Sequence, residues 1–150
     1  SDVYPVLTNF PVEMLKNENY GVKSLWDIIY KASMKDYIIS CGSSKSLDSL
    51  GKFNNEKGGH SFSILDCKEA MVNRNIIRLI KLRDPRGDNE WKGKWATDSD
   101  NWTDETRWLF EGIKETDCFY IEMSEYMEYF DSTEICKKTS TLITKSAFIE

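Results

Sequence analysis

Residues 60–87 read HSFSILDCKEAMVNRNIIRLIKLRDPRG, and two apolar runs inside this stretch decide the fold. The run at 61–67 predicts a strand with its large apolar side chains on one face. The run at 76–82 predicts a second strand, because its β-branched residues favour a strand over a helix. An Asp-Pro-Arg-Gly turn at 84–87 ends that strand.

The segments on either side complete an α+β pattern. Towards the N-terminus, a helix capped by its first serine is predicted at 24–35, and a short buried strand follows at 37–41. Towards the C-terminus, we expect a strand at 118–123, a helix capped by Ser124 and a closing strand at 134–137. Short connections favour antiparallel pairing, so the expected fold is a β-rich antiparallel sheet or barrel with a few short helices.

Length and composition indicate one domain with a buried core, since the chain has 150 residues and is 40% apolar. We expect a lead-in at 1–22, a main unit at 23–137 and a C-terminal extension at 138–150. The net charge of −5 argues against a nucleic-acid partner, which would need a basic surface. No apolar run is long enough to span a membrane, and the first residues do not resemble a secretion signal.

The four cysteines, at positions 41, 67, 118 and 136, lack the C-x-x-C spacing of zinc and thiol-redox sites. They are interpreted as buried structural thiols in a reducing compartment. The expected location is therefore the cytoplasm, and association with a cytoskeletal assembly stays open.

The single histidine, His60, is a candidate general base. It stands between a Gly-Gly pair and a buried strand, which would hold the ring firmly and leave one side open. Asp84 would accept a hydrogen bond from its other ring nitrogen if the two strands are neighbours. On spacing alone two plainer alternatives stay open: an ordinary surface or core histidine, and an Asp that merely begins an Asp-Pro turn.

Three motifs in this order resemble the calpain family of papain-like cysteine proteases. The chain has Gly-His-Ser-Phe-Ser-Ile at 59–64, Arg-Asp-Pro-Arg-Gly at 83–87 and Glu-Trp-Lys-Gly-Lys-Trp at 90–95. Calpains show Gly-His-Ala-Tyr-Ser-Val, Arg-Asn-Pro-Trp-Gly and Glu-Trp-x-Gly-x-Trp, and the likeness covers residues 20–137. The resemblance implies the second half of a calpain catalytic core, which supplies the triad His and Asn. In the family, the first half supplies the nucleophilic Cys across a cleft.

By this resemblance His60 is the general base, and Asp84 occupies the orienting position of the family's Asn. The carboxylate would favour the imidazolium form and raise the pKa of His60 by about 1 to 3. Arg86 stands where the family has the Trp that shelters the His–Asn pair from water, and its charge would oppose that rise. No segment of this chain resembles the Cys-bearing half.

The resemblance also implies calcium regulation through two acidic loops. Glu90 fits the first loop. The second loop, Asp-Gly-Glu-Phe-Trp in the family, reads Thr-Asp-Cys-Phe-Tyr at 116–120 and lacks both expected acids. The acidic residues at 98–105 do not have EF-hand spacing and are interpreted as a solvated loop. No cofactor is therefore certain, and calcium binding is expected to be weak or absent.

Four tryptophans, at 91, 95, 102 and 108, have two interpretations. They could form an exposed peptide-binding platform, or they could pin an irregular segment to the core. The second interpretation is favoured because buried aromatic rings commonly anchor such segments.

Two functional hypotheses follow. In the first, the chain is a calpain-like half-domain without a catalytic Cys, inactive alone, that acts as a pseudo-peptidase interaction or structural module. In the alternative, it is part of an active calcium-regulated calpain-type endopeptidase whose Cys subdomain lies outside this chain. In both, a Cys-bearing half-domain or another protein docks near His60 and Arg86. On sequence alone, both an enzyme part and a non-catalytic module stay open.

Overall fold

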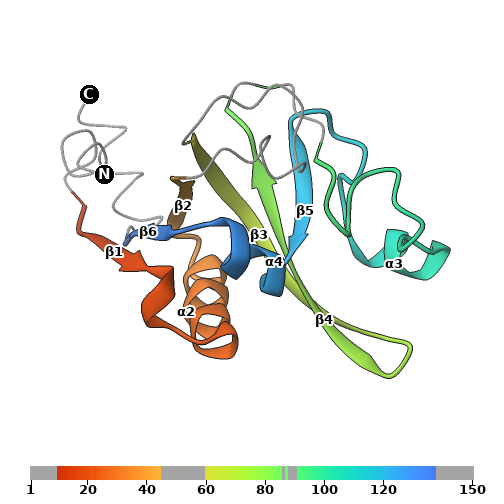
Figure 1. Ribbon diagram of the computed structural model, residues 1–150, viewed down its shortest axis with the longest axis horizontal. Coiled ribbons are helices and arrows are strands. Elements are labelled where there is room, and N and C mark those ends of the chain that lie inside the picture. Colours follow the sequence, from red (N-terminus) through yellow and green to blue (C-terminus); the bar gives the residue numbers. More distant parts are fainter. Residues whose placement is uncertain (1–9, 45–59, 86, 88–90, 138–150) are drawn as a thin grey trace.

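The computed structural model describes residues 10–44, 60–85, 87 and 91–137. Six strands form one antiparallel sheet in the order β1-β6-β2-β3-β4-β5 (Figure 1), which confirms the β-rich α+β class. The strands are β1 Val12–Lys16, β2 Ile38–Ser43, β3 His60–Val72, β4 Asn75–Arg83, β5 Cys118–Glu122 and β6 Ser132–Cys136. The helices are α2 Val22–Met34, α3 Asp104–Leu109 and α4 Met123–Tyr129, with a 3-10 turn η1 at Asn17–Asn19.

The two apolar runs that decide the fold form the long β3–β4 hairpin. Its two-residue turn consists of Asn73 and Arg74, which both have positive φ angles (49° and 67°), as the tight hairpin turn with matching twist requires. The pairing shifts between Ile64 and Asp66, so Leu65 forms a β-bulge. The predicted strands are therefore neighbours, and both are longer than their apolar runs.

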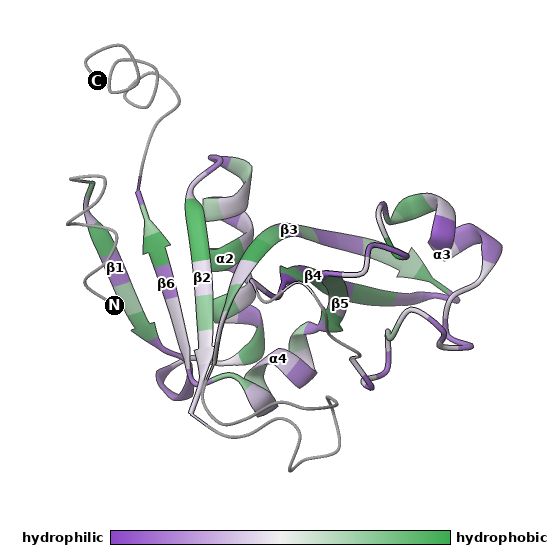
Figure 2. Ribbon diagram, turned by 90° about the horizontal axis from the view of Figure 1, so that it is seen from above, coloured by the Kyte–Doolittle hydropathy of each residue, from purple (hydrophilic) through white to green (hydrophobic). Residues whose placement is uncertain are grey.

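Helix α2 lies against one face of the sheet (Figure 2). Its residues Leu25, Trp26, Ile29 and Ala32 are buried. The predicted Ser24 cap is wrong by one turn. Gly21 is the N-cap, and its N–H donates to the Ser24 Oγ at 2.9 Å.

The predicted cap of α4 is also wrong, because Glu122 rather than Ser124 precedes the first helical residue. The helix starts as soon as β5 ends, and α4 packs beside α2. Its buried residues are Met123, Tyr126 and Tyr129.

The core consists of two clusters. The larger one lies between the sheet and the helices α2 and α4. The smaller one packs the segment 95–113 on β4 and β5, through residues that include Leu79, Trp102 and Tyr120. Successive side chains of β4 point to opposite faces of the sheet and so enter both clusters. Leu79 belongs to the smaller cluster and Ile80 to the larger.

The interpretation of the tryptophans as anchors is confirmed for Trp91, Trp95 and Trp102, which are all buried. The Trp102 indole N–H also donates to the carbonyl of Ala96 at 2.9 Å, which fixes the irregular segment. The interpretation is wrong for Trp108, whose side chain is 86% exposed on the short helix α3.

Candidate functional site

Four strand ends meet at one end of the sheet, and both candidate catalytic positions lie there. β2 ends at Ser43, which pairs with His60 at the start of β3. Gly42 pairs with Ser61 on one side and with Ser132, at the start of β6, on the other. β4 ends one residue before Asp84.

Asp84 is almost completely buried, with 1% of its surface exposed. Its backbone N–H donates to the carbonyl of Asp117 at 2.9 Å, and its own carbonyl accepts from the Gly87 N–H at 2.9 Å. These bonds fix the turn that follows β4. A buried carboxylate at a turn is unusual, since Asp at such positions is mostly solvated.

The register brings backbone positions 60 and 84 close together. Ser63 pairs with Arg83, so one more step along the ladder puts position 84 opposite position 62. Positions 60 and 84 thus lie on neighbouring strands, two residues apart in the register. The side chain of His60, and the whole of Arg86 and Glu90, lie outside the described residues. The His60–Asp84 pair and the calcium role of Glu90 therefore stay predictions.

An open groove of about 560 Å³ lies beside these two positions, and we call it the strand-end groove. It is lined mostly by small residues: Gly42, Ser43, Ser44, Ser61, Pro85, Asp131 and Ser132. Ser61 directly follows position 60, and Pro85 directly follows Asp84.

Sequence reasoning did not single out Ser43 or Ser44. It missed Asp131, which is one acid among 25 and carries no motif. Only the pairing of β2 with β6 brings Asp131 to the groove, and that pairing joins residues far apart in the chain.

None of the four cysteines has the environment of a nucleophile. All are free thiols and all are buried. Burial raises the pKa of Cys41 far above its usual range and that of Cys67 to about 12. Burial, followed by hydrogen bonds to Glu115 and Asp117, raises the pKa of Cys118 to about 11. At neutral pH Cys41, Cys67 and Cys118 are therefore protonated, whereas the reactive species is the thiolate.

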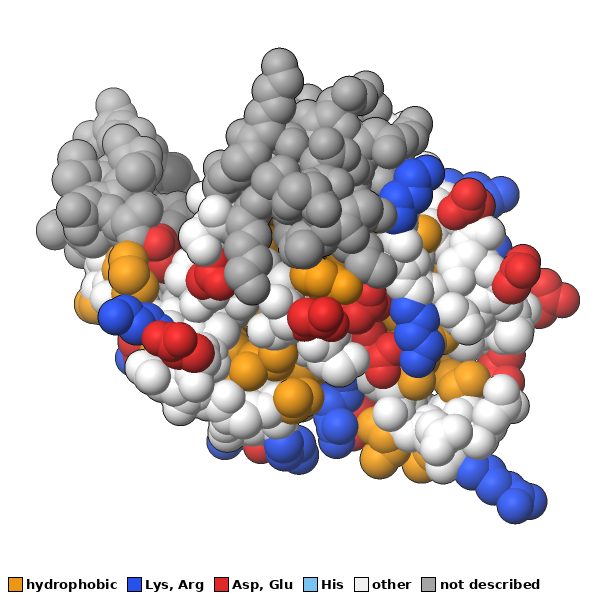
Figure 3. Space-filling model, viewed as in Figure 1, with side chains coloured by type: hydrophobic (Ala, Val, Ile, Leu, Met, Phe, Trp, Pro, Cys, Tyr) orange, Lys and Arg blue, Asp and Glu red, His pale blue; other side chains and the backbone are white. Residues whose placement is uncertain are grey.

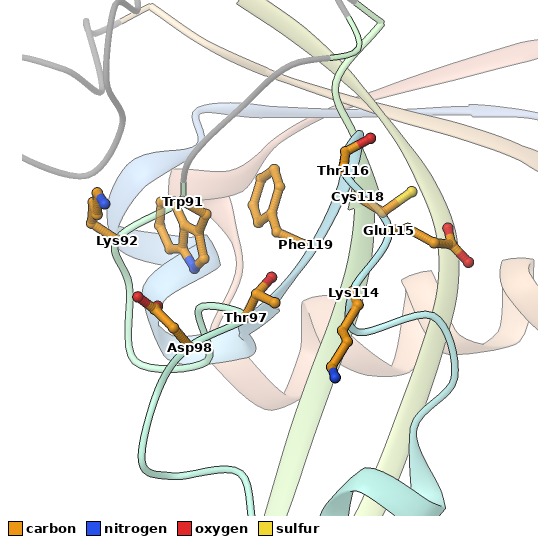
Figure 4. A pocket seen from close by; sticks show the side chains of 9 residues that line it. All are labelled: Trp91, Lys92, Thr97, Asp98, Lys114, Glu115, Thr116, Cys118 and Phe119. Carbon is orange, nitrogen blue, oxygen red and sulfur yellow. The ribbon is translucent and has the colours of Figure 1, made fainter.

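A second cavity, of about 350 Å³, lies between the stacked rings of Trp91 and Phe119 and the segment 114–118 (Figure 4). Glu115, Asp117 and Cys118 could offer ligand atoms within 4.8 Å of one another. Both carboxylates already have basic partners. Lys81 lies 3.2 Å from Glu115, and Arg83 lies 3.2 Å from Asp117.

Two hydrogen bonds lower the pKa of Glu115. The larger effect comes from the Cys118 thiol and the smaller one from Lys81. The thiol also donates to Asp117 at 3.4 Å, so it acts as a hydrogen-bond donor. The cluster is therefore neutralised by the chain's own cations. The acidic residues of the predicted solvated loop, such as Asp98 and Asp104, are exposed.

The visible surface carries both charges. Basic and acidic side chains alternate over the described residues in Figure 3, without a broad basic face. Among the described helices, none is both long enough and apolar enough to cross a membrane.

Comparison with known proteins matches residues 1–137 to the model of the calpain family of cysteine proteases. The human calpain-2 catalytic subunit is 26% identical over 131 residues, which are 83% of this chain and 19% of that protein. The rat calpain-1 catalytic subunit is 28% identical over 122 residues, 77% of this chain and 17% of that protein. The chain thus spans less than a fifth of the length of these curated relatives.

Proposed function

Since the chain belongs to the calpain family of cysteine proteases, we propose that it is the His-bearing half of a calpain-type catalytic core. The observation that carries this proposal is the meeting of positions 60 and 84 at one strand end, beside an open groove. The nucleophile comes from a Cys-bearing half-domain, because the four thiols of this chain are buried. Alone, the chain is inactive.

In the assembled site His60 takes the proton of the partner's Cys and later gives it to the leaving amine. Asp84 accepts a hydrogen bond from the other ring nitrogen and holds the ring in position. Because a carboxylate stabilises the imidazolium more than an amide does, Asp84 favours the thiolate–imidazolium pair. The buried position of Asp84 strengthens this effect, since a low local dielectric weakens screening.

The test combines the chain with a Cys-bearing half-domain of a calpain catalytic subunit and follows hydrolysis of a fluorogenic peptide. We expect activity in the mixture and none with the chain alone. His60→Ala should abolish it, whereas Asp84→Asn, which restores the family's residue, should retain it. Asp98→Asn, a change at an exposed residue lining the second cavity, serves as the matched control.

The pH profile separates the role of Asp84 from a merely structural one. Replacing a carboxylate by an amide lowers the pKa of a neighbouring imidazole by about 1 to 3. The limb of the profile that reports His60 should therefore move to lower pH in Asp84→Asn. An unchanged limb would contradict the proposed orienting contact.

A non-catalytic interaction module is the second candidate. Arg86 at the position of the sheltering Trp favours it, because in the family that Trp keeps water away from the His–Asn pair and an arginine would not replace it. In that case the half-domain would bind near His60 and Arg86, and the mixture would hydrolyse no peptide. Calorimetry of the two halves distinguishes this outcome from failure of both proposals, in which neither binding nor hydrolysis occurs.

We also propose that calcium has little effect on this chain. The carboxylates of Glu115 and Asp117 are paired with Lys81 and Arg83. With a dissociation constant above 1 mM, 1 mM calcium would stabilise the fold by less than about 0.5 kcal/mol. A larger rise in the unfolding temperature would contradict this. The four free thiols support a cytoplasmic location.

A further inference from the structure

We propose that the strand-end groove binds an extended peptide and that Asp131 selects a basic side chain in it. The inference deepens the proposed function and rests on it, because it names the substrate class of the same site.

Asp131 carries the only formal charge among the described residues that line the groove. Its carboxylate is held in place, because Oδ2 accepts from the Ser44 N–H at 2.5 Å and from the Ser44 hydroxyl. Its backbone is fixed as well. The carbonyl of Asp131 accepts from the Asn17 N–H at 2.8 Å, and its N–H donates to the carbonyl of Gly42 at 2.9 Å.

The second carboxylate oxygen, Oδ1, has no hydrogen-bond partner among the described residues, and the residue is exposed. A fixed, accessible anion loses little side-chain entropy when it pairs with a cation. A single carboxylate is too few ligands for a hard divalent ion, so a lysine or arginine side chain is the better match.

The rest of the lining suits a peptide main chain. Gly42 has no side chain, and Ser61 and Ser132 are small and offer hydroxyl groups. Main-chain N–H and C=O groups need such partners when they leave water. The volume of about 560 Å³ lies within the range of ligand sites.

The strand spacing gives the position of the selected residue. Asp131 precedes β6, and position 60 lies on β3, with β2 between them. Two strand spacings amount to about 10 Å, and an extended peptide advances about 3.3 Å per residue. The basic residue of the peptide therefore lies about three residues from the scissile bond at His60.

The test is an NMR titration of the ¹⁵N-labelled chain with blocked hexapeptides that differ at one residue: lysine, norleucine or glutamate. We expect the lysine peptide to bind roughly two- to five-fold more tightly than the norleucine peptide, as for an exposed ion pair. The glutamate peptide should bind most weakly. The affected amides should include Gly42, Ser61 and Ser132.

Asp131→Asn is the decisive variant, because its amide oxygen still accepts both bonds from Ser44. It should bind the lysine and norleucine peptides equally, whereas Asp98→Asn should keep the preference. The inference would be overturned if the wild type bound the lysine and norleucine peptides equally or bound neither. It would also be overturned if the amide shifts lay outside the groove, or if the preference for lysine survived Asp131→Asn. If the half-domains assemble and hydrolyse peptide while this preference is missing, only the role of Asp131 fails. If the preference is present but His60→Ala leaves hydrolysis intact, the proposed function fails instead.

Discussion

Replacing Thr133 by valine should destabilise the protein more than any loss of packing at this position explains. Thr133 is fully buried in β6 and joins two other buried polar side chains. Its hydroxyl donates to the Asn17 Oδ1 at 2.7 Å, and the Tyr126 hydroxyl lies 2.5 Å from it. A hydroxyl has one proton, so Tyr126 must be the donor in the second bond.

Valine keeps the shape of threonine but leaves the Tyr126 O–H and the Asn17 Oδ1 without this partner. Each buried group that loses its hydrogen bond costs about 1–3 kcal/mol, so we expect a loss of about 2–6 kcal/mol. Thr133→Ser keeps both bonds and removes one methyl group, which costs about 1 kcal/mol. The polar network therefore predicts that valine is worse than serine, whereas packing alone predicts the opposite order.

The assay is urea unfolding followed by tryptophan fluorescence, with the midpoint compared at unchanged m-value. The double variant Tyr126→Phe/Thr133→Val removes one of the stranded groups. It should therefore be less destabilised than the sum of the single variants, by about 0.5–3 kcal/mol. A serine variant that is less stable than the valine variant, or strict additivity in the double variant, would refute the reasoning.

Three further predictions concern other parts of the structure. Trp102→Ala should cost about 3–5 kcal/mol in urea unfolding, whereas Trp108→Ala should change stability by no more than about 0.5 kcal/mol and remove most acrylamide quenching. The Cys118 pKa of about 11 exceeds the unfolded value of about 8.5, so the native state retains a proton that the unfolded chain loses. Its contribution to stability should fall with rising pH, by about 1.4 kcal/mol per pH unit between those values, and Cys118→Ala should show a correspondingly flatter dependence of the urea midpoint on pH. Gly112→Ala should lower the unfolding temperature, because its φ of 69° is costly for alanine and the added Cβ would collide with the Glu115 carboxylate.

Much of the sheet could be predicted because the hydrophobic pattern of its central strands is visible within each strand's own sequence. β3 and β4 have long apolar runs that end at turn residues, and those signals hold whatever surrounds them. The edge strand β1 was missed, because its residues are mostly half-buried or exposed and only Leu15 points into the core. Helix α3 was missed because six residues give no helical period.

The cap residues show a limit of the same kind. Ser24 and Ser124 each fit a cap by type, yet the N-caps are Gly21 and Glu122, three residues and two residues earlier. Where a helix starts depends on where the preceding segment leaves the core, and this is a tertiary property. The candidate site also has a predictable and an unpredictable part. Asp84 follows a readable strand, whereas Asp131 reaches the groove only through a pairing that sequence spacing does not reveal.

The division of the core gives β4 and β5 a mechanical role. Each contributes buried side chains to both clusters: Ile80 and Phe119 face the large one, and Leu79 and Tyr120 face the small one. The backbone amides of β4 and β5 should exchange with deuterium last, because their exposure requires both clusters to open. A protease cut within 97–101 would then loosen the smaller cluster first. The strand-end groove would stay in place until β4 and β5 themselves separate.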